Sequence, residues 1–211
     1  MITEFGNILK EKQQPTFNYN TYNVTKLTNS KNISKQIKDL ETSWLFLGWQ
    51  TAGIKDKKDF VTLKVINTIL GGGMSSRMYK NLREENGLAY QLGSSYTPKA
   101  LGGVFMTYIG TNPETLNFSK SKIFSEIEKL KMEFVSDTEL KDAKDRLKGG
   151  FIIAMETNSE KASIVGLFEA LGFGYDFLDN YVKMIDEITA SDIIKVANKY
   201  FNNIYVESTV K

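Results

Sequence analysis

An arginine and a tyrosine seven residues apart, Arg83 and Tyr90, are the residues of this sequence best suited to chemistry. A guanidinium is a planar, permanently charged donor that can bind carboxylates or carbonyls bidentately, and a phenol is a single fixed donor. Their spacing alone favours a structural interpretation, in which Arg83 pairs with Glu84, Glu85 or another nearby acid and Tyr90 packs half-buried in a strand.

Arginine is rare in this chain, which draws attention to the same segment. Only three of the 27 cationic residues are arginine, and two of them, Arg77 and Arg83, lie within seven positions. Arg77 follows Ser75 and Ser76. We expect a structural role for these three residues, in which the serines cap a helix and Arg77 donates to loop carbonyls.

Three consecutive glycines, Gly71, Gly72 and Gly73, precede this arginine-containing segment. A phosphate-binding loop would require G-x-x-x-x-G-K-[ST] or G-x-G-x-x-G after a strand, and neither pattern is present. Glycine permits positive φ angles and close backbone contact without a steric clash. We therefore expect a tight or mobile turn whose backbone approaches a substrate closely.

The sequence contains neither cysteine nor histidine. Without cysteine there are no disulfides, thiol nucleophiles or thiolate metal sites, and without histidine there is no Ser-His-Asp triad and no H-x-x-E-H or H-E-x-x-H zinc helix. The acidic residues are scattered, and none of them forms a D-x-[DN]-x-[DN]-G calcium loop. We expect no metal site and no cofactor in this chain.

Charge and hydropathy argue against two further classes of protein. The net charge is +2 and lysines alternate with acids, which is typical of a solvated surface and not of a nucleic-acid-binding stripe. No run approaches about 18 consecutive apolar residues, so we expect no membrane-spanning helix. The N-terminus lacks the pattern of a secretory signal, and whether Met1 is a native start stays open.

The remaining chain divides into a polar extension and one regular domain. Residues 1–30 are expected to form a linker or N-terminal extension, and residues 31–211 a single domain with sufficient apolar content for a core. Hydrophobic periodicity predicts strands and helices in the following order. The strands are at 32–39, 43–51, 89–97, 103–111 and 203–210, and the helices are at 56–70, 75–86, from Asn112 onward, 137–156, 158–172, 176–187 and 190–201.

Several local signals refine these elements. Capping-box spacing is present in three pairs: Ser136 with Glu139, Thr157 with Glu160, and Thr189 with Asp192. The two-residue period of the strand at 89–97 predicts one shared face for Tyr90, Leu92, Ser94 and Tyr96. Gly149 and Gly150 lie inside a predicted helix, where each costs about 1 kcal/mol relative to alanine, so we expect a close contact between this helix and another element.

Few long strands with hairpins among them, combined with many helices, indicate an α+β fold. We expect a two-layer sandwich in which a mainly antiparallel sheet carries helices packed on one face. In this arrangement the helix at 75–86 and the strand at 89–97 bring Arg83 and Tyr90 toward the same cleft edge.

Residues 70–90 follow the pattern L-G-G-G-x-S-S-R-x5-R-E-x-x-G-L-A-Y. This pattern resembles the C-terminal, non-catalytic half of the insulinase/pitrilysin-type zinc metallopeptidases, an inverzincin group that includes the mitochondrial processing peptidases. The resemblance extends to residues 44–49, 102–105 and 139–144, and residues 1–30 show none. It implies the same α+β layering, with the complete peptidase built from two such domains facing each other.

The resemblance also implies a function for the segment. Arg83 and Tyr90 would hold substrate carbonyls and stabilise the oxyanion, and the glycines at 71–73 would contact the peptide substrate. Zinc would be held by H-x-x-E-H in a partner domain or subunit, where the glutamate activates the metal-bound water. Residues 56–70 would correspond to that zinc helix in degenerate form. This chain alone is expected to be inactive.

We therefore expect the chain to be a substrate-binding domain that closes the chamber of a zinc metallopeptidase. The alternative is a non-proteolytic structural core subunit of the same fold, like those of the respiratory bc1 complex. The expected partners are the zinc-binding domain or subunit and a peptide, with self-association as a further option. Nucleic acid is not among them.

Overall fold

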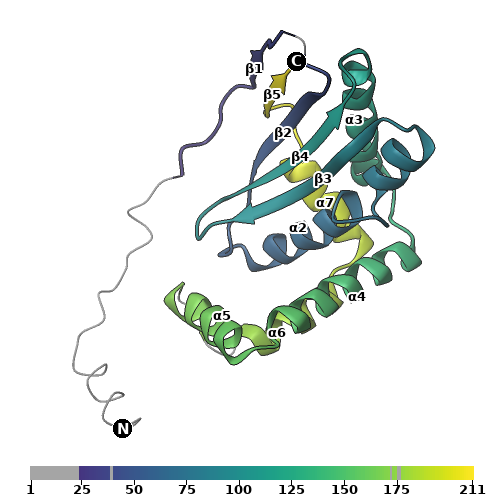
Figure 1. Cartoon of the computed structure of the whole chain (residues 1–211). Helices are drawn as coiled ribbons and strands as arrows, with labels where there is room; N and C mark the ends of the chain where they lie inside the picture. Colours follow the sequence, from purple (N-terminus) through teal and green to yellow (C-terminus); the bar gives the residue numbers. More distant parts are fainter. Residues whose placement is uncertain (1–23, 39, 172, 175–176) are drawn as a thin grey trace, which may run out of the picture.

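The computed structural model describes residues 24–38, 40–171, 173–174 and 177–211. Its centre is a five-stranded sheet with the strand order β1-β5-β2-β4-β3 (Figure 1). The pair β1–β5 is parallel, and all other pairs are antiparallel. The strands are β1 (Lys31–Lys35), β2 (Ser43–Thr51), β3 (Ala89–Pro98), β4 (Gly103–Thr111) and β5 (Val206–Val210).

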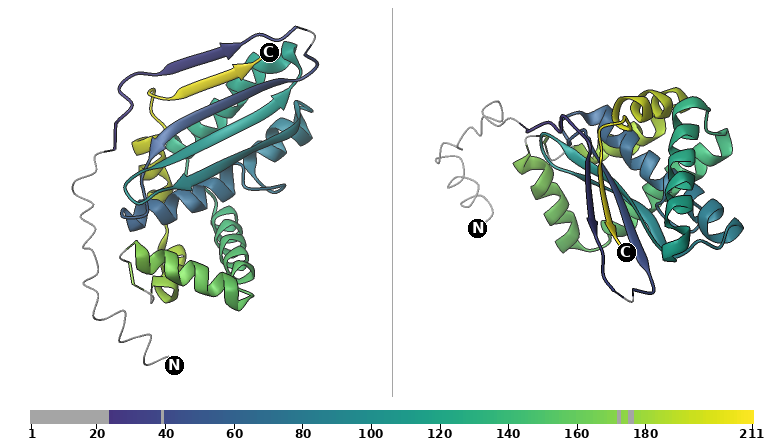
Figure 2. Two further views of the ribbon diagram at one scale, coloured as in Figure 1. Left: turned by 60° about the vertical axis from the view of Figure 1, so that its left-hand side comes forward. Right: turned by 90° about the horizontal axis from the view of Figure 1, so that it is seen from above.

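The helices pack against one face of this sheet, as Figures 1 and 2 show. Helices α2, α3 and α7 contact the strands, while α4 and α6 pack against α2. This layering confirms the predicted α+β fold with helices on one face. The helical elements are α2 (Lys57–Leu70), the π-helix η2 (Tyr79–Glu85), the 3-10 turn η3 (Pro113–Thr115), α3 (Leu116–Met132), α4 (Asp137–Ala154), α5 (Asn158–Ala170), α6 (Phe177–Glu187) and α7 (Ala190–Tyr200).

Alternation along β2 divides its side chains between a buried and an open face. Trp49 lies in the core, where its ring meets Phe201 edge-on at 5.5 Å and its indole N–H donates to the Asn202 carbonyl at 3.1 Å. Trp44 lies on the opposite face, stacked on Phe46 with ring centroids 6.0 Å apart. The two tryptophans therefore report on different environments, one fully buried and one half-exposed.

Two of the three predicted capping boxes are confirmed. Thr157 with Glu160, and Thr189 with Asp192, each exchange both hydrogen bonds of the motif. At the start of α4 the Ser136 hydroxyl accepts from the Glu139 amide, but no return bond is made. The Glu139 carboxylate is bound elsewhere, because Arg77 offers it a charged bidentate partner.

The predicted face of β3 is wrong at Tyr90. Ala89 pairs with Thr111 and Gln91 with Gly110, so a β-bulge leaves Tyr90 between them without its own partner in the ladder. One extra residue reverses the alternation on its N-terminal side. Ala89 is therefore buried on the core side, while Tyr90 is exposed.

The expected extension lies mostly outside the described residues, which begin at 24. Residues 24–30 form neither helix nor strand. Gln50 at the end of β2 binds them through its side chain, accepting from the Leu27 amide at 2.5 Å and donating to the Thr25 carbonyl at 2.8 Å. The boundary at residue 30 stays a prediction.

The close contact predicted for Gly149 and Gly150 is not present within the described part of the chain. A Cβ built at either residue meets no described atom within 4 Å. Gly53 is the opposite case, since a Cβ there would collide with the backbone of Lys99 and Gly102. Packing inside this domain thus requires glycine at 53 and not at 149 or 150.

These glycines give a matched pair of stability predictions. Gly149→Ala should stabilise α4 by about 1 kcal/mol, which raises the melting temperature by about 2–4 °C in a chain of this size. Gly53→Ala should destabilise the fold by roughly 1–3 kcal/mol through overpacking. Thermal unfolding followed by circular dichroism measures both, and a loss of stability in Gly149→Ala would reveal a packing role for that position.

Candidate functional site

Arg83 and Tyr90 come from two elements joined by a short turn. Arg83 lies in the last turn of η2 and Tyr90 is the second residue of β3. Between them Gly87 has φ 59°, a left-handed conformation that favours glycine. The Arg83 Nη1 donates to the Tyr90 backbone carbonyl at 3.2 Å, and its guanidinium lies 5.0 Å from the centre of the Tyr79 ring.

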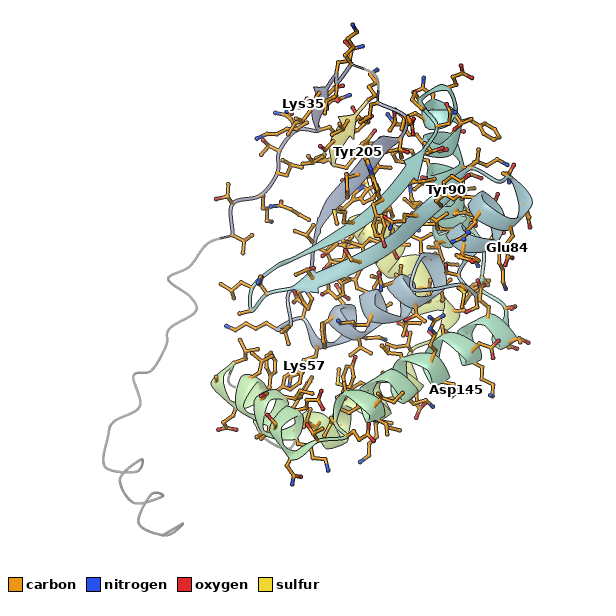
Figure 3. The ribbon with its side chains drawn as sticks, in the orientation of Figure 1. Lys35, Lys57, Glu84, Tyr90, Asp145 and Tyr205 are labelled. Atoms are coloured by element: carbon orange, nitrogen blue, oxygen red, sulfur yellow. The ribbon has the colours of Figure 1, made fainter. Side chains whose placement is uncertain are left out.

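Arg83 and Tyr90 both line a pocket of about 520 Å³, which we call the site pocket. Glu41 and Thr42 from the segment before β2 and Asn112 after β4 also line it. Tyr90 is 90% exposed, so the structural alternative of half-buried packing does not apply to it (Figure 3). Within the described part of the chain Arg83 forms no ion pair with Glu84 or Glu85. Both residues of the pair thus border one pocket, and the contact between them runs from the Arg83 side chain to the Tyr90 backbone carbonyl.

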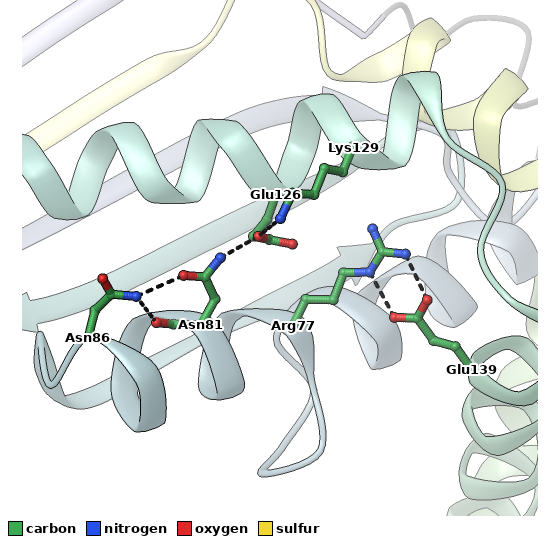
Figure 4. A network of polar contacts seen from close by, with 6 residues as sticks. All are labelled: Arg77, Asn81, Asn86, Glu126, Lys129 and Glu139. Atoms are coloured by element: carbon green, nitrogen blue, oxygen red, sulfur yellow. Dashed lines mark hydrogen bonds and ion pairs between the residues drawn. The ribbon is translucent and has the colours of Figure 1, made fainter.

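A buried polar network fixes η2, as Figure 4 shows. The Asn81 side chain donates to the Glu126 carboxylate of α3 at 2.6 Å, and Lys129 donates to the same oxygen at 2.7 Å. Asn86 in turn donates to the Asn81 carbonyl. Glu126 is only 3% exposed, and a carboxylate so deeply buried needs such partners. Residues Met78 and Leu82 insert into the core beside it.

Arg77 attaches the start of this segment to α4. Its Nε and Nη2 each donate to one oxygen of Glu139, both at 2.7 Å (Figure 4). These bonds raise the pKa of Arg77 above its usual value. The structural role predicted for Arg77 is therefore present, but its acceptor is a carboxylate 62 positions away and not a loop carbonyl.

The first residue of the glycine turn, Gly71, packs against the edge of the sheet. Its amide donates to the Asn67 carbonyl at 3.1 Å, and its carbonyl accepts from the Ser94 amide of β3 at 3.2 Å. A Cβ on Gly71 would collide with the Ser94 backbone. The absence of a side chain is therefore required by contact with β3.

The other two glycines also face this chain's own atoms. A Cβ on Gly72 would press on the backbone of Thr68. Gly73 has φ 150°, and a Cβ there would collide with the guanidinium of Arg146 from α4. The glycine turn is thus closely approached by atoms of its own domain. The approach of a substrate to its backbone stays a prediction.

The donor set of this chain does not fit zinc. Within the described residues no three His, Cys, Asp or Glu side chains are grouped closely enough to hold a metal ion. The acid of α2, Asp59, is engaged by Lys199 at 2.6 Å and by the Tyr200 hydroxyl at 2.7 Å. In the same described part, every helix is too short or too polar for a membrane span.

Sequence reasoning missed three residues that hold the segment in place. The spacing of Glu139 predicts only a capping residue. The alternation of lysines and acids predicts a solvated position for Glu126, which is wrong because Glu126 is buried. Arg146 was not considered at all, although it is the third of the three arginines in the chain. Its rarity was the one available signal, and its Nη1 lies 3.1 Å from the Ser75 hydroxyl.

Comparison with known families places this geometry in context. The family model described as the peptidase M16 inactive domain matches residues 3–147. The match contains the glycine turn, η2, the site pocket residues and the start of α4. It also includes most of the first 30 residues, where we expected no resemblance.

Curated relatives carry names of the same kind. The chain is 32% identical over 173 residues to an "uncharacterized zinc protease" of Rickettsia felis, which covers 82% of this chain and 42% of the relative. It is 27% identical over 168 residues to another of Bacillus subtilis, covering 80% of this chain and 41% of the relative. The chain thus spans about two fifths of the length of these relatives.

Solved structures share the fold. A protease from Helicobacter pylori superposes with a TM-score of 0.80 and 25% identity, covering 89% of this chain and 45% of that one. A peptidase M16 inactive domain from Pseudomonas fluorescens gives a TM-score of 0.74 over 86% of this chain and 43% of that one, and at 24% identity it supports the fold alone. From the family match and these likenesses together, the chain belongs to the peptidase M16 inactive domain family.

Proposed function

We propose that this chain is a substrate-binding, non-catalytic domain of a zinc metallopeptidase, in which Arg83 and Tyr90 act on the peptide during hydrolysis at a zinc held by another domain or subunit. The observation that supports this most directly is the site pocket, which both residues line. A tyrosine that is 90% exposed on a β-bulge contributes little to folding. Bulges often turn a side chain toward a functional site.

The chemistry of the pair suits an extended peptide. The Tyr90 phenol can donate to the oxygen of the scissile carbonyl as negative charge develops there. Arg83 keeps its planar donor group beside the same pocket, with one N–H bound to the Tyr90 carbonyl and others available to a substrate carbonyl or carboxylate. The rest of the domain holds Arg83 and Tyr90 in position, because packing fixes both η2 and β3.

The zinc would belong to the part of the protein that this chain does not contain. More than half the length of the Rickettsia felis relative, which is named a zinc protease, lies beyond the match. The present chain has no histidine or cysteine. In this proposal one half of the protein holds the metal, and the other half contributes contacts to the substrate.

The open face of the sheet offers a surface for that partner domain. Trp44, Phe46 and Tyr108 form a row of half-exposed rings on the face without helices, with Phe46 and Tyr108 6.2 Å apart. Trp44 packs on Gly110, and Gly110 lines the site pocket. A domain that closes over the pocket would therefore also cover this row and bury its apolar area.

The structural core subunit remains the rival proposal. A complex III assembly from Candida albicans contains a chain that superposes with a TM-score of 0.72 over 85% of this chain. At 13% identity this likeness supports the fold alone. The effect of substituting Arg83 or Tyr90 on peptide hydrolysis separates the two proposals, because a structural core subunit needs neither donor.

Tyr90→Phe removes one hydroxyl from the site pocket. In the enzyme reconstituted with its zinc-binding domain we expect kcat to fall roughly 100-fold or more, with an unchanged melting temperature because the side chain is exposed. Tyr205→Phe, which removes a hydroxyl outside the pocket, is the matched control. Equal activity of both variants would remove Tyr90 from the site.

Arg83→Lys retains the charge and loses the planar fork. We expect kcat/KM to fall, because an ammonium cannot reproduce the guanidinium geometry toward both the Tyr90 carbonyl and the substrate. Steady-state kinetics on a peptide substrate measure this effect. Wild-type kcat/KM in Arg83→Lys would show that charge alone is needed.

The purified chain alone should hold no zinc and cleave no peptide. The chain has neither histidine nor cysteine, the usual ligands of structural zinc, and the acidic side chains of the described residues form no group that could hold a metal ion. Metal analysis after dialysis provides the measurement. Stoichiometric zinc that survives dialysis, in a chain shown to be monomeric, would contradict the proposal.

Trp44 provides a test of the partner surface. Addition of the zinc-binding domain should shift the fluorescence of the half-exposed Trp44 to shorter wavelength, because its surroundings lose water. Trp44→Phe should abolish the shift and leave only the signal of the buried Trp49. Light scattering run in parallel reports association itself, and a chain that stays monomeric and ignores the zinc-binding domain would refute the partner proposal.

A further inference from the structure

The third arginine of the chain, Arg146, contacts the glycine turn from outside. It lies on α4, seven residues after Glu139 and hence two turns further along the same side of the helix. Its Nη1 is 3.1 Å from the Ser75 hydroxyl, and its Nη2 lies against Gly73. Arg77 and Ser75 are thus bound by two residues on the same face of α4, Glu139 and Arg146.

The contact suits a guanidinium in particular. A flat, delocalised cation can lie against a peptide backbone that has no side chain and still donate at its edge, whereas an ammonium is a compact, strongly hydrated charge. The chain uses lysine for all but three of its 27 cationic residues. Arg83 donates to the Tyr90 carbonyl and Arg146 to the Ser75 hydroxyl, so both contact the segment 73–90. Arg77 lies in this segment and attaches it to α4 through Glu139.

We infer that Arg146 is a positioning residue that fixes the glycine turn on α4 and thereby sets where its backbone meets the substrate. The inference rests on the proposed substrate role of the turn. Arg146 would not touch the substrate itself. Its effect would pass through Gly73 and Ser75.

The arrangement of the other contacts makes the expected effect local. Gly71 is bound to Ser94 on one side of the turn, and Arg77 is bound to Glu139 on the other. Both contacts remain when Arg146 is removed. Only the stretch from residue 72 to 76 loses its external support, including the turn closed by the Ser76 amide on the Gly73 carbonyl at 3.0 Å.

The first experiment is amide hydrogen exchange on the full chain. Arg146→Met should speed exchange of the Ser76 amide roughly tenfold, as expected for a local opening, with exchange in α2 and β3 and the melting temperature unchanged. Lys141→Met is the matched control, because this cation on the same helix pairs with Asp145 at 2.8 Å. Lys141 does not line the pocket that Ser75, Arg77 and Arg146 border. Unchanged Ser76 exchange in Arg146→Met would overturn the inference.

A double-mutant cycle identifies the contact that carries the effect. Ser75→Ala removes the hydroxyl acceptor and should speed exchange less than Arg146→Met does. The double variant should exchange no faster than Arg146→Met alone, because the two residues share one interaction. Fully additive effects would show that Arg146 acts without Ser75. Wild-type protection in Arg146→Lys would show that an ammonium suffices, which contradicts the role assigned to the guanidinium.

Kinetics of the reconstituted enzyme separate this inference from the proposed function. Arg146→Met should raise KM several-fold and leave kcat nearly unchanged, since the turn would bind substrate and not the transition state selectively. Faster exchange without a change in KM would mean that Arg146 positions the turn but the turn binds no substrate. In that case the positioning role stands and the substrate role of the glycines is lost.

Discussion

The bidentate ion pair between Arg77 and Glu139 is the constraint on which the site depends. It joins a helix that follows the glycine turn to a helix from much later in the chain, and both of its bonds are 2.7 Å long. With this end fixed, burial of Met78 and Leu82 sets the rotation of η2. The position of Arg83 then follows, because it lies one residue after Leu82, at the exposed side of the same π-helix.

Most of the fold could be predicted because its signals are local. Apolar spacing located α2 and the hairpin strands to within about a residue, and the pairs Thr157 with Glu160 and Thr189 with Asp192 began their helices as expected. The bulge at Tyr90 could not be predicted in this way, since it depends on how β3 aligns with β4. The π-helical winding of η2 and the destination of the Glu139 side chain also arise from tertiary contacts.

The candidate site shows the same division between local and distant causes. The spacing of Arg83 and Tyr90, read with the family resemblance, was enough to place them at one pocket. Their exposure followed from the bulge and from the anchoring of η2 to α3 and α4. Helix α2 serves the core, since its Val61, Leu63 and Ile66 are fully buried.

The pairing of the first and last strands has a consequence for folding. β5 lies between β1 and β2, and Lys31 aligns with Val206 across nearly the whole length of the domain. Contacts between residues so far apart in sequence close large loops and slow the folding reaction. During synthesis one edge of β2 therefore stays unpaired until residues 206–210 have left the ribosome. The fully exposed β1 can join only after β5 is in place, which makes it the first strand to detach when the native sheet fluctuates.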